Sequence, residues 1–171
     1  EPHKGLKAMF TFMNTARIGT AIQGLAHTEL AFQNSLPYAK ERRSMRVLSG
    51  KKEPEQVADA IIHHSDVARM LLIQKAFSEG GRSMIYHAAR YADKMTEATH
   101  AGDHEEAEKL DEKLDFYTPI LKGFLTECGI EASKHAIQVF GGHGYIKEWG
   151  MEQIARDARI STLYEGTTGV Q

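Results

Sequence analysis

The sequence is short of cysteine and proline and has no long apolar run. Its one cysteine, Cys128, cannot form an internal disulfide, and its apolar surroundings indicate a buried side chain in a reducing compartment. Nothing resembles a signal peptide or a run of about 20 apolar residues, so secretion and membrane insertion have no support. We therefore expect a cytoplasmic protein without a membrane segment.

Neither sign of charge dominates the sequence. The 21 Lys and Arg residues are balanced by 23 Asp and Glu residues, which argues against a surface that neutralises many nucleic-acid phosphates. Hydrophobic residues make up 42% and charged residues 26%, fractions typical of a globular chain. At 171 residues the chain is long enough for one domain with a core, and we predict that residues 1–171 form a single domain.

The scarcity of proline leaves long stretches for helices, and the alternation typical of strands is scarce. Apolar residues recur at three- and four-residue steps over residues 6–32, which predicts a first helix that continues past Pro37 with a kink. Its apolar stripe comprises Leu6, Met9, Phe10, Met13, Ile18, Ile22 and Leu25.

Two further long helices are predicted. The loop-like "SGKKEPEQ" precedes a second helix that starts near Pro54 and continues through Tyr91, carrying Val57 and Leu72 inward. The acidic "HAGDHEEAEKLDEKLD" predicts a short solvated helix or a connection, and a third helix follows Pro119, with Phe124 on its apolar face. The sequence therefore predicts an all-α fold, an antiparallel four-helix bundle.

Two glycine-containing segments do not fit a plain bundle. In "QVFGGHGYIKEWG" the glycines could bring backbone amides close to a phosphate, but a turn that ends a helix explains them more simply. In "RDARISTLYEGTTGV" Glu165 lies between an aromatic ring and a flexible turn, so it is either a solvated surface acid or a base held for a substrate. The residues alone favour a turn that ends a helix in the first segment and a solvated surface acid in the second.

Other candidate sites have equally simple explanations. Arginines in "PYAKERRSMR" could bind a diphosphate, although a solvated basic face is the default. The pairs His63-His64 and His100/His104 lack a closed ligand set, so we expect no metal site. No nucleophile elbow supports a Ser-His-Asp triad.

Taken together, four segments resemble the C-terminal domain of the flavin-dependent acyl-CoA dehydrogenases: "MNTARIG", "YAKERRSM", "QVFGGHGY" and "RDARISTLYEGTT". They occur in the order that the family shows, and the resemblance covers essentially the whole chain. It implies a four-helix bundle that follows an N-terminal helical domain and a middle β-domain, both absent from this sequence. The stretch "HHSDVARMLLIQKA" is similar to a bacterial branch that acts on larger or unusual acyl-CoAs, including 3-methylthiopropionyl-CoA.

The resemblance assigns Glu165 as the base that removes the α-proton of an acyl thioester while a β-hydride passes to the flavin. The region around Asn14 holds no carboxylate that could replace it. The expected substrate-binding residues are Asn14, Arg17, Tyr164 and Gly166.

FAD is the cofactor that the resemblance implies. The residues expected to contact it, partly across a subunit interface, are Arg42, Gln138, Gly141, Gly142, Thr167 and Gly169, with His64 and Ser65 as further flavin neighbours. The implied partners are an acyl-CoA substrate, a second or further copies of the chain in a homodimer or homotetramer, and an electron-transfer flavoprotein. An acyl-CoA oxidase of the same fold and a helical oligomerisation module without catalysis remain as alternatives.

Overall fold

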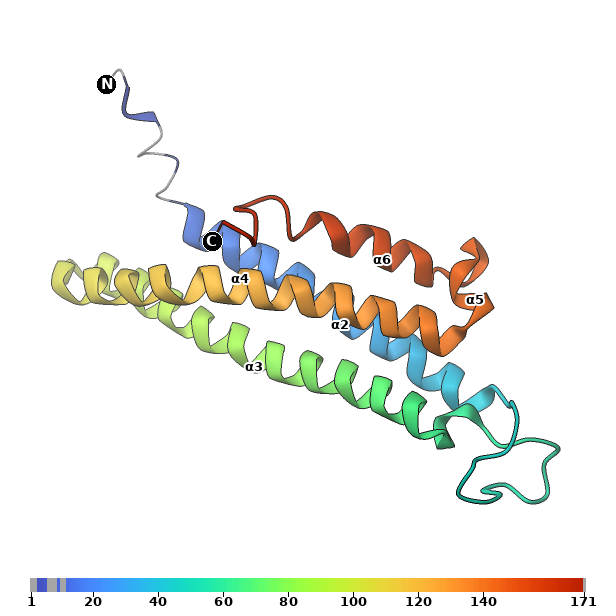
Figure 1. Ribbon diagram of the computed structural model, residues 1–171. Helices are drawn as coiled ribbons and strands as arrows, with labels where there is room; N and C mark the ends of the chain where they lie inside the picture. The colour runs from blue at the N-terminus through green and yellow to red at the C-terminus, as the bar shows by residue number, and fades with distance from the viewer. Residues whose placement is uncertain (1–2, 6–8, 10–11, 171) are drawn as a thin grey trace.

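The computed structural model describes residues 3–5, 9 and 12–170, and within these residues the fold consists of helices and turns without a strand (Figure 1). The long helices are α2 (Met13–Glu41), α3 (Ser65–Ala101) and α4 (His104–Phe140). The shorter elements are η1 (Ile61–His63), α5 (Gly142–Tyr145), η2 (Lys147–Trp149) and α6 (Met151–Ile160). Successive long helices and α6 run in alternating directions, so the predicted all-α antiparallel bundle is confirmed, with α6 as a short fourth helix.

The first long helix agrees with the prediction over most of its length. It contains Pro37 and ends at Glu41. α2 begins at Met13, and the predicted helix start near residue 6, with the predicted core residues Leu6 and Phe10, lies outside the described residues.

The predicted start of the second helix is wrong. The helix begins at Ser65, about ten residues after Pro54, and Val57 is 98% exposed. The carboxylate of Asp59 accepts hydrogen bonds from backbone N–H groups of the preceding segment, so that segment forms a compact loop instead of a helical turn. Leu72, also predicted to face inward, is 66% exposed.

The predicted start of the third helix is also wrong. Gly102, in the left-handed conformation at φ 77°, ends α3, and the Asp103 side chain accepts a hydrogen bond from Glu106 N at 3.1 Å. This cap and an acidic first turn favour helix, so the acidic stretch belongs to α4 and Pro119 lies within it. Phe124, predicted to be in the core, is 48% exposed.

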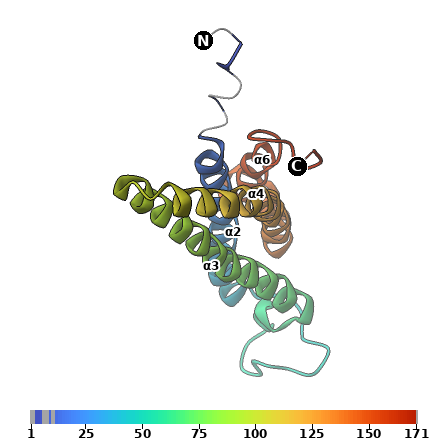
Figure 2. The same ribbon diagram turned by 90° about the vertical axis from the view of Figure 1, so that its left-hand side faces the viewer.

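The backbones of α2 and α4 approach each other closely at two glycines. A Cβ on Gly24 would lie 2.3 Å from the carbonyl oxygen of Leu125, and one on Gly129 would lie 2.9 Å from the carbonyl oxygen of Gly24. Glycine therefore permits the backbones to touch, because any side chain would force the helices apart. The α3–α4 hairpin extends past the start of α2 at one end, and the loop of residues 42–64 projects at the other (Figures 1 and 2). None of the described helices is both long and apolar enough to cross a bilayer.

Candidate functional site

The predicted site residues fall into two regions. The first, here called the end hollow, is bounded by the end of α2, the end of α4 and the start of α5. Its lining comprises Tyr38, Arg42, Ser44, Ile61, Val139, Phe140, Gly141, Gly142 and His143. The second, here called the C-terminal turn, is formed by residues 163–169 after α6. Figure 1 shows α5 near one end of α2 and the C-terminus near the other.

The end hollow brings together three of the residues predicted to bind FAD. Arg42 caps α2, while Gly141, at φ 61°, ends α4, and Gly142 begins α5. All three are exposed, as is Gln138 in the last turn of α4. A Cβ added to Gly141 or Gly142 would meet no atom of the described residues within 4 Å, so the surface there is open to a ligand.

An aromatic cluster forms the wall of the end hollow and was not predicted. The Tyr38 ring stacks on Phe140 with centroids 4.0 Å apart, and its hydroxyl lies 2.9 Å from Nδ1 of His143. His143 in turn stacks on Trp149 at 5.0 Å. The chain can fold back so closely because residue 144 is glycine: a Cβ there would lie 2.6 Å from the carbonyl oxygen of Ile137. Stacked rings of this kind hold the wall in one arrangement.

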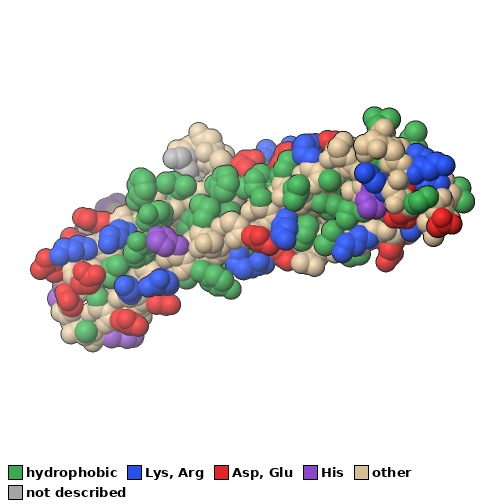
Figure 3. Space-filling view, turned by 90° about the horizontal axis from the view of Figure 1, so that it is seen from below, with side chains coloured by type: hydrophobic (Ala, Val, Ile, Leu, Met, Phe, Trp, Pro, Cys, Tyr) green, Lys and Arg blue, Asp and Glu red, His purple; other side chains and the backbone are tan. Residues whose placement is uncertain are grey.

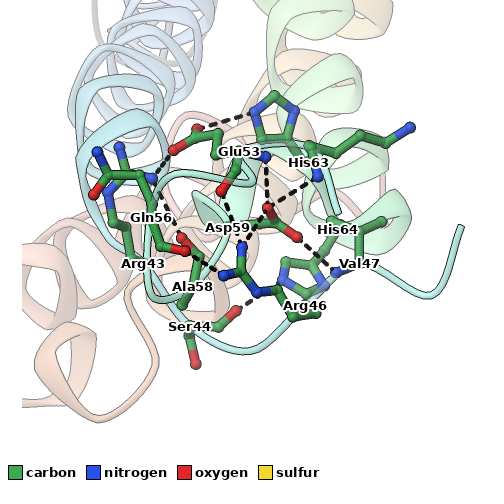
Figure 4. Close-up of polar contacts among 11 residues, drawn as sticks. Arg43, Ser44, Arg46, Val47, Glu53, Gln56, Ala58, Asp59, His63 and His64 are labelled. Carbon is green, nitrogen blue, oxygen red and sulfur yellow. Dashed lines mark hydrogen bonds and ion pairs between the residues drawn. The ribbon is translucent and has the colours of Figure 1, made fainter. Parts of the chain in front are cut away.

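The loop of residues 42–64 is organised around Asp59, whose side chain is fully buried (Figure 4). Its carboxylate accepts hydrogen bonds from the backbone N–H groups of Val47, Lys52 and Glu53 at 2.8–3.0 Å, and from the Arg46 guanidinium at 3.2 Å. These bonds, that of the Val47 amide first, hold the pKa of Asp59 below its usual value although burial opposes them.

The loop fixes the rim of the end hollow. The backbone N–H of Ile61 donates to the carbonyl of Arg42 at 2.8 Å, and that of Ser44 to the carbonyl of Asp59 at 3.1 Å. His64, predicted as a flavin neighbour, directs its Nε2 to the carbonyl of Ser44 at 3.0 Å, and Ser65 begins α3. The polar tip of His64 therefore contacts the loop.

The C-terminal turn places Glu165 in an unusual backbone conformation. Glu165 has φ 54° and Gly166 has φ 94°, two successive residues in a region that favours glycine. Two neighbouring hydrogen bonds close the turn, from Thr168 N to the carbonyl of Thr162 at 3.1 Å and from Thr167 Oγ1 to the carbonyl of Leu163 at 3.1 Å. A glutamate at positive φ persists only where its surroundings determine the backbone.

Gln23 and Arg17 of α2 lie near the turn. The Tyr164 hydroxyl donates to Oε1 of Gln23, which fixes the ring that precedes Glu165. Arg17 has a buried Nε that finds no hydrogen-bond partner within the described part of the chain. Such an orphaned donor is a place where a ligand can supply the missing acceptor. Thr167 and Gly169, predicted to contact flavin, are both exposed.

Asn14, the remaining predicted substrate residue, bonds within the bundle. Its Nδ2 donates to Asp115 Oδ1 at 2.8 Å, and its Oδ1 accepts from Thr118 Oγ1 at 2.9 Å. The amide therefore links α2 to α4, and its contact with substrate stays a prediction.

Lys122 on α4 is the residue that the sequence reasoning missed. It is fully buried, and its Nζ donates a hydrogen bond to the carbonyl of Gly166. Burial lowers the pKa of Lys122, the negative charge of Glu165 opposes that change, and Arg17 adds to it. Thr118 and Thr126, four residues to either side, are also buried, so Lys122 lies on the inward face of α4.

Comparison with known proteins agrees with this arrangement. The family model described as "Acyl-CoA dehydrogenase, C-terminal domain" matches residues 3–171. The 3-methylmercaptopropionyl-CoA dehydrogenase of Ruegeria pomeroyi is 40% identical over 171 residues, which is 100% of this chain and 28% of that protein. Butyryl-CoA dehydrogenase from Megasphaera elsdenii superposes with a TM-score of 0.74 at 25% identity, covering 99% of this chain and 37% of the other.

A third similar structure is an acyl-CoA dehydrogenase from Bacillus anthracis complexed with FAD, with a TM-score of 0.81 at 19% identity over 98% of this chain and 27% of that one. The described helices and the two regions they hold thus define a helical domain of the acyl-CoA dehydrogenase type. The chain belongs to the acyl-CoA dehydrogenase family and corresponds to its C-terminal domain. The chain spans 28% of the length of the Ruegeria relative. The predicted similarity to the bacterial branch that includes this relative is confirmed.

Proposed function

We propose that this chain is the C-terminal domain of an FAD-dependent acyl-CoA dehydrogenase that converts an acyl-CoA to a trans-2-enoyl-CoA, with Glu165 as the base. The observation that carries this proposal is the C-terminal turn, where a glutamate at φ 54° interacts electrostatically with the buried ammonium of Lys122. Lys122 also interacts with the charge of Arg17, whose buried Nε has no hydrogen-bond partner in the described part of the chain. Family membership supplies the reaction class.

The chemistry asks for a positioned base. An α-proton of a thioester is only weakly acidic, so the carboxylate must be held at that C–H bond while the thioester carbonyl is polarised. Glu165 takes the α-proton, and Arg17, Tyr164 and Gly166 border the acyl-CoA. The flavin, when bound, accepts the β-hydride, so that two electrons leave the substrate and a Cα=Cβ double bond forms. Asn14 assists from α2 by keeping that helix against α4.

The end hollow fits the ADP portion of FAD. It offers the exposed Arg42 guanidinium for a diphosphate and two glycines around which the described structure leaves space. Gln138 adds an exposed amide. Thr167 and Gly169 of the C-terminal turn would contact the flavin end of FAD. Because the hollow and the turn lie near opposite ends of α2, we propose that each FAD is shared between two subunits.

The assembly and partners follow from the same proposal. Large apolar side chains stay exposed along the bundle, among them Leu72 and Phe116, each 66% exposed, and the face seen in Figure 3 carries many hydrophobic side chains. Surfaces of this kind mark contacts between proteins. We propose a cytoplasmic bacterial homodimer or homotetramer in which preceding helical and β-domains complete each site and an electron-transfer flavoprotein takes the electrons.

The test is Glu165→Gln in the intact enzyme. Mixing with acyl-CoA under anaerobic conditions should bleach the flavin at least about 100-fold more slowly than in the wild type, since a general base contributes factors of this size. The control Glu79→Gln removes an exposed carboxylate of α3 and should bleach normally. Normal bleaching by Glu165→Gln would refute the assignment. Comparing oxygen with an electron-transfer flavoprotein as acceptor then separates a dehydrogenase from an oxidase.

A further inference from the structure

Lys122 is a charged side chain where a bundle normally places an apolar one. It lies on α4 with no exposed surface, between the buried Leu121 and Leu125 in sequence. Removing an ammonium from water carries a large penalty unless it gains strong partners. The partner that Lys122 gains is the backbone carbonyl of Gly166, 44 residues away in the chain.

That carbonyl belongs to the residue directly after Glu165. Its orientation fixes the peptide plane between Gly166 and Thr167, and so the direction in which the chain leaves the glutamate. Thr168 lies over the next residue of α4, because its methyl group would be 3.7 Å from a Cβ added to Gly123. The C-terminal turn thus lies over α4 at Lys122 and Gly123.

The turn needs such an anchor. Glu165 and Gly166 both have positive φ, and for a residue with a side chain this conformation is disfavoured unless other contacts determine it. The closing bonds from Thr167 and Thr168 hold the turn to residues 162–163. Tyr164 ties the start of the turn to α2 through Gln23, whereas Lys122 ties the backbone directly after Glu165 to α4.

We propose that Lys122 is a positioning residue that holds the Glu165–Gly166 turn in its reactive conformation through the hydrogen bond to Gly166. The proposal rests on the proposed function, because it assigns Lys122 to the same proton transfer. In this role Lys122 acts through the backbone carbonyl of Gly166.

The charge state agrees with this role. Burial lowers the pKa of Lys122, so the folded protein binds this proton less tightly than the unfolded chain does. The burial of the charge is therefore a penalty at neutral pH, and it is relieved only as the pH rises through the lowered pKa. Replacing Lys122 by an apolar side chain of similar length removes the penalty, so a residue kept only for stability would not be lysine.

The experiment compares Lys122→Met with Gln74→Met in the intact enzyme. Gln74 is a matched control, because it is also fully buried and its Nε2 donates only to the Met70 carbonyl of its own helix, at 3.2 Å. Lys122→Met should keep the wild-type unfolding temperature or exceed it, and bind acyl-CoA within about threefold of the wild type. Its anaerobic flavin reduction should slow about 10- to 100-fold, since small misplacements of a catalytic group have effects of this size. Gln74→Met should reduce flavin at the wild-type rate.

Hydrogen exchange gives a readout besides activity. The amides of residues 166–169 should exchange faster in Lys122→Met and remain as in the wild type in Gln74→Met. Should Lys122→Met not accumulate as folded enzyme, Lys122→Leu is measured by the same rate and exchange criteria.

The outcomes separate the two proposals. A wild-type reduction rate and unchanged exchange in Lys122→Met, with the rate lost in Glu165→Gln, would overturn the role of Lys122 and leave the proposed function standing. A wild-type rate in Glu165→Gln would overturn the proposed function itself.

Discussion

The end hollow and the C-terminal turn differ in how their residues are held. At the end hollow the predicted contacts Arg42, Gly141 and Gly142 are exposed, and space surrounds the glycines in the described structure. At the C-terminal turn the backbone is fixed from below by a buried lysine and closed by its own threonines. The two regions are separated along the chain by α6, whose ten residues span roughly 15 Å.

The difference corresponds to two tasks. A diphosphate is bound by charge and backbone amides, which an open surface completed by another chain can supply. Proton abstraction depends on orientation, because a base gains its effect only when held at the reacting bond. Variants in the hollow should therefore change cofactor affinity, and variants below the turn should change rate.

The largest effect on stability is expected from Gly144→Ala, next to the hollow. The added Cβ would lie 2.6 Å from the carbonyl oxygen of Ile137 and 2.8 Å from its Cα, so backbone must move. We expect a loss of about 1–3 kcal/mol, as for other overpacked sites. Thermal unfolding of the intact enzyme measures it.

Gly142→Ala is the matched control, since its Cβ meets no described atom within 4 Å. It should unfold at the wild-type temperature while binding FAD more weakly, because the methyl group occupies the surface that the cofactor approaches. Equal stability losses in the two variants would break the distinction between a packed wall and an open surface.

Arg42→Ala should have the next largest effect and should act on affinity alone. Losing one charge-assisted hydrogen bond, worth about 1.5 kcal/mol, weakens FAD binding roughly tenfold. The rate of flavin reduction in the fully loaded enzyme should not change, since Arg42 lies in the end hollow. FAD titration of the apoenzyme measures the affinity, with the exposed Lys40→Ala as control. A slowed reduction step would contradict the separation of tasks.

The sequence predicted the residues of the end hollow better than the boundaries of the helices that carry them. Arg42 and Gly141 are nearly 100 residues apart, and their meeting followed from the family resemblance, because no local pattern shows which helix ends adjoin. The predicted helix boundaries were wrong where a side chain competes with the backbone for hydrogen bonds. Pro54 is a plausible helix start, but the Asp59 carboxylate accepts hydrogen bonds from three backbone N–H groups and holds the segment in a loop. This arrangement depends on the burial of Asp59, which no local pattern reveals.

At the C-terminal turn, the sequence identified the residue but not its conformation. Glu165 was identified by its motif, yet its positive φ and its anchor could not be. A lysine between leucines suggests a side chain that reaches solvent. In the fold Lys122 is instead fully buried, with its Nζ bonded to the carbonyl of Gly166. The roles of these site residues stay predictions until the variants are measured.

Asp59 should make the stability of the loop of residues 42–64 depend on pH, and should leave the C-terminal turn unaffected. Its pKa lies below the usual value, so the carboxylate stabilises the loop above the unfolded pKa near 3.8, and this contribution is lost as pH falls through the lower folded pKa. Hydrogen exchange of residues 42–64, corrected for its intrinsic pH dependence, should rise in acid in the wild type. In Asp59→Asn it should already be fast at pH 7.

The matched control for the loop is Asp103→Asn, which makes the same change from carboxylate to amide at the cap of α4 on the far hairpin. It should leave exchange of residues 42–64 unchanged. Acid-independent exchange in the wild-type loop would show that Asp59 does not organise it.

Cys128 should give the smallest effect, because it lies inside α4 away from both regions. Burial first, then the charge of Glu127, raises the pKa of its thiol to about 11. The neutral thiol is therefore favoured in the fold. Its contribution to stability is complete below the unfolded pKa of 9.0 and is lost as pH rises through about 11.

At pH 8 the native protein should hold roughly 100-fold less thiolate than the unfolded chain, so iodoacetamide should label Cys128 at least that much more slowly in buffer than in denaturant. Exposed Thr96→Cys, made in a Cys128→Ala background, should label equally fast in both. Rapid native labelling of Cys128 would mean that the bundle opens between the hollow and the turn, and the two regions could not then be treated as independently held.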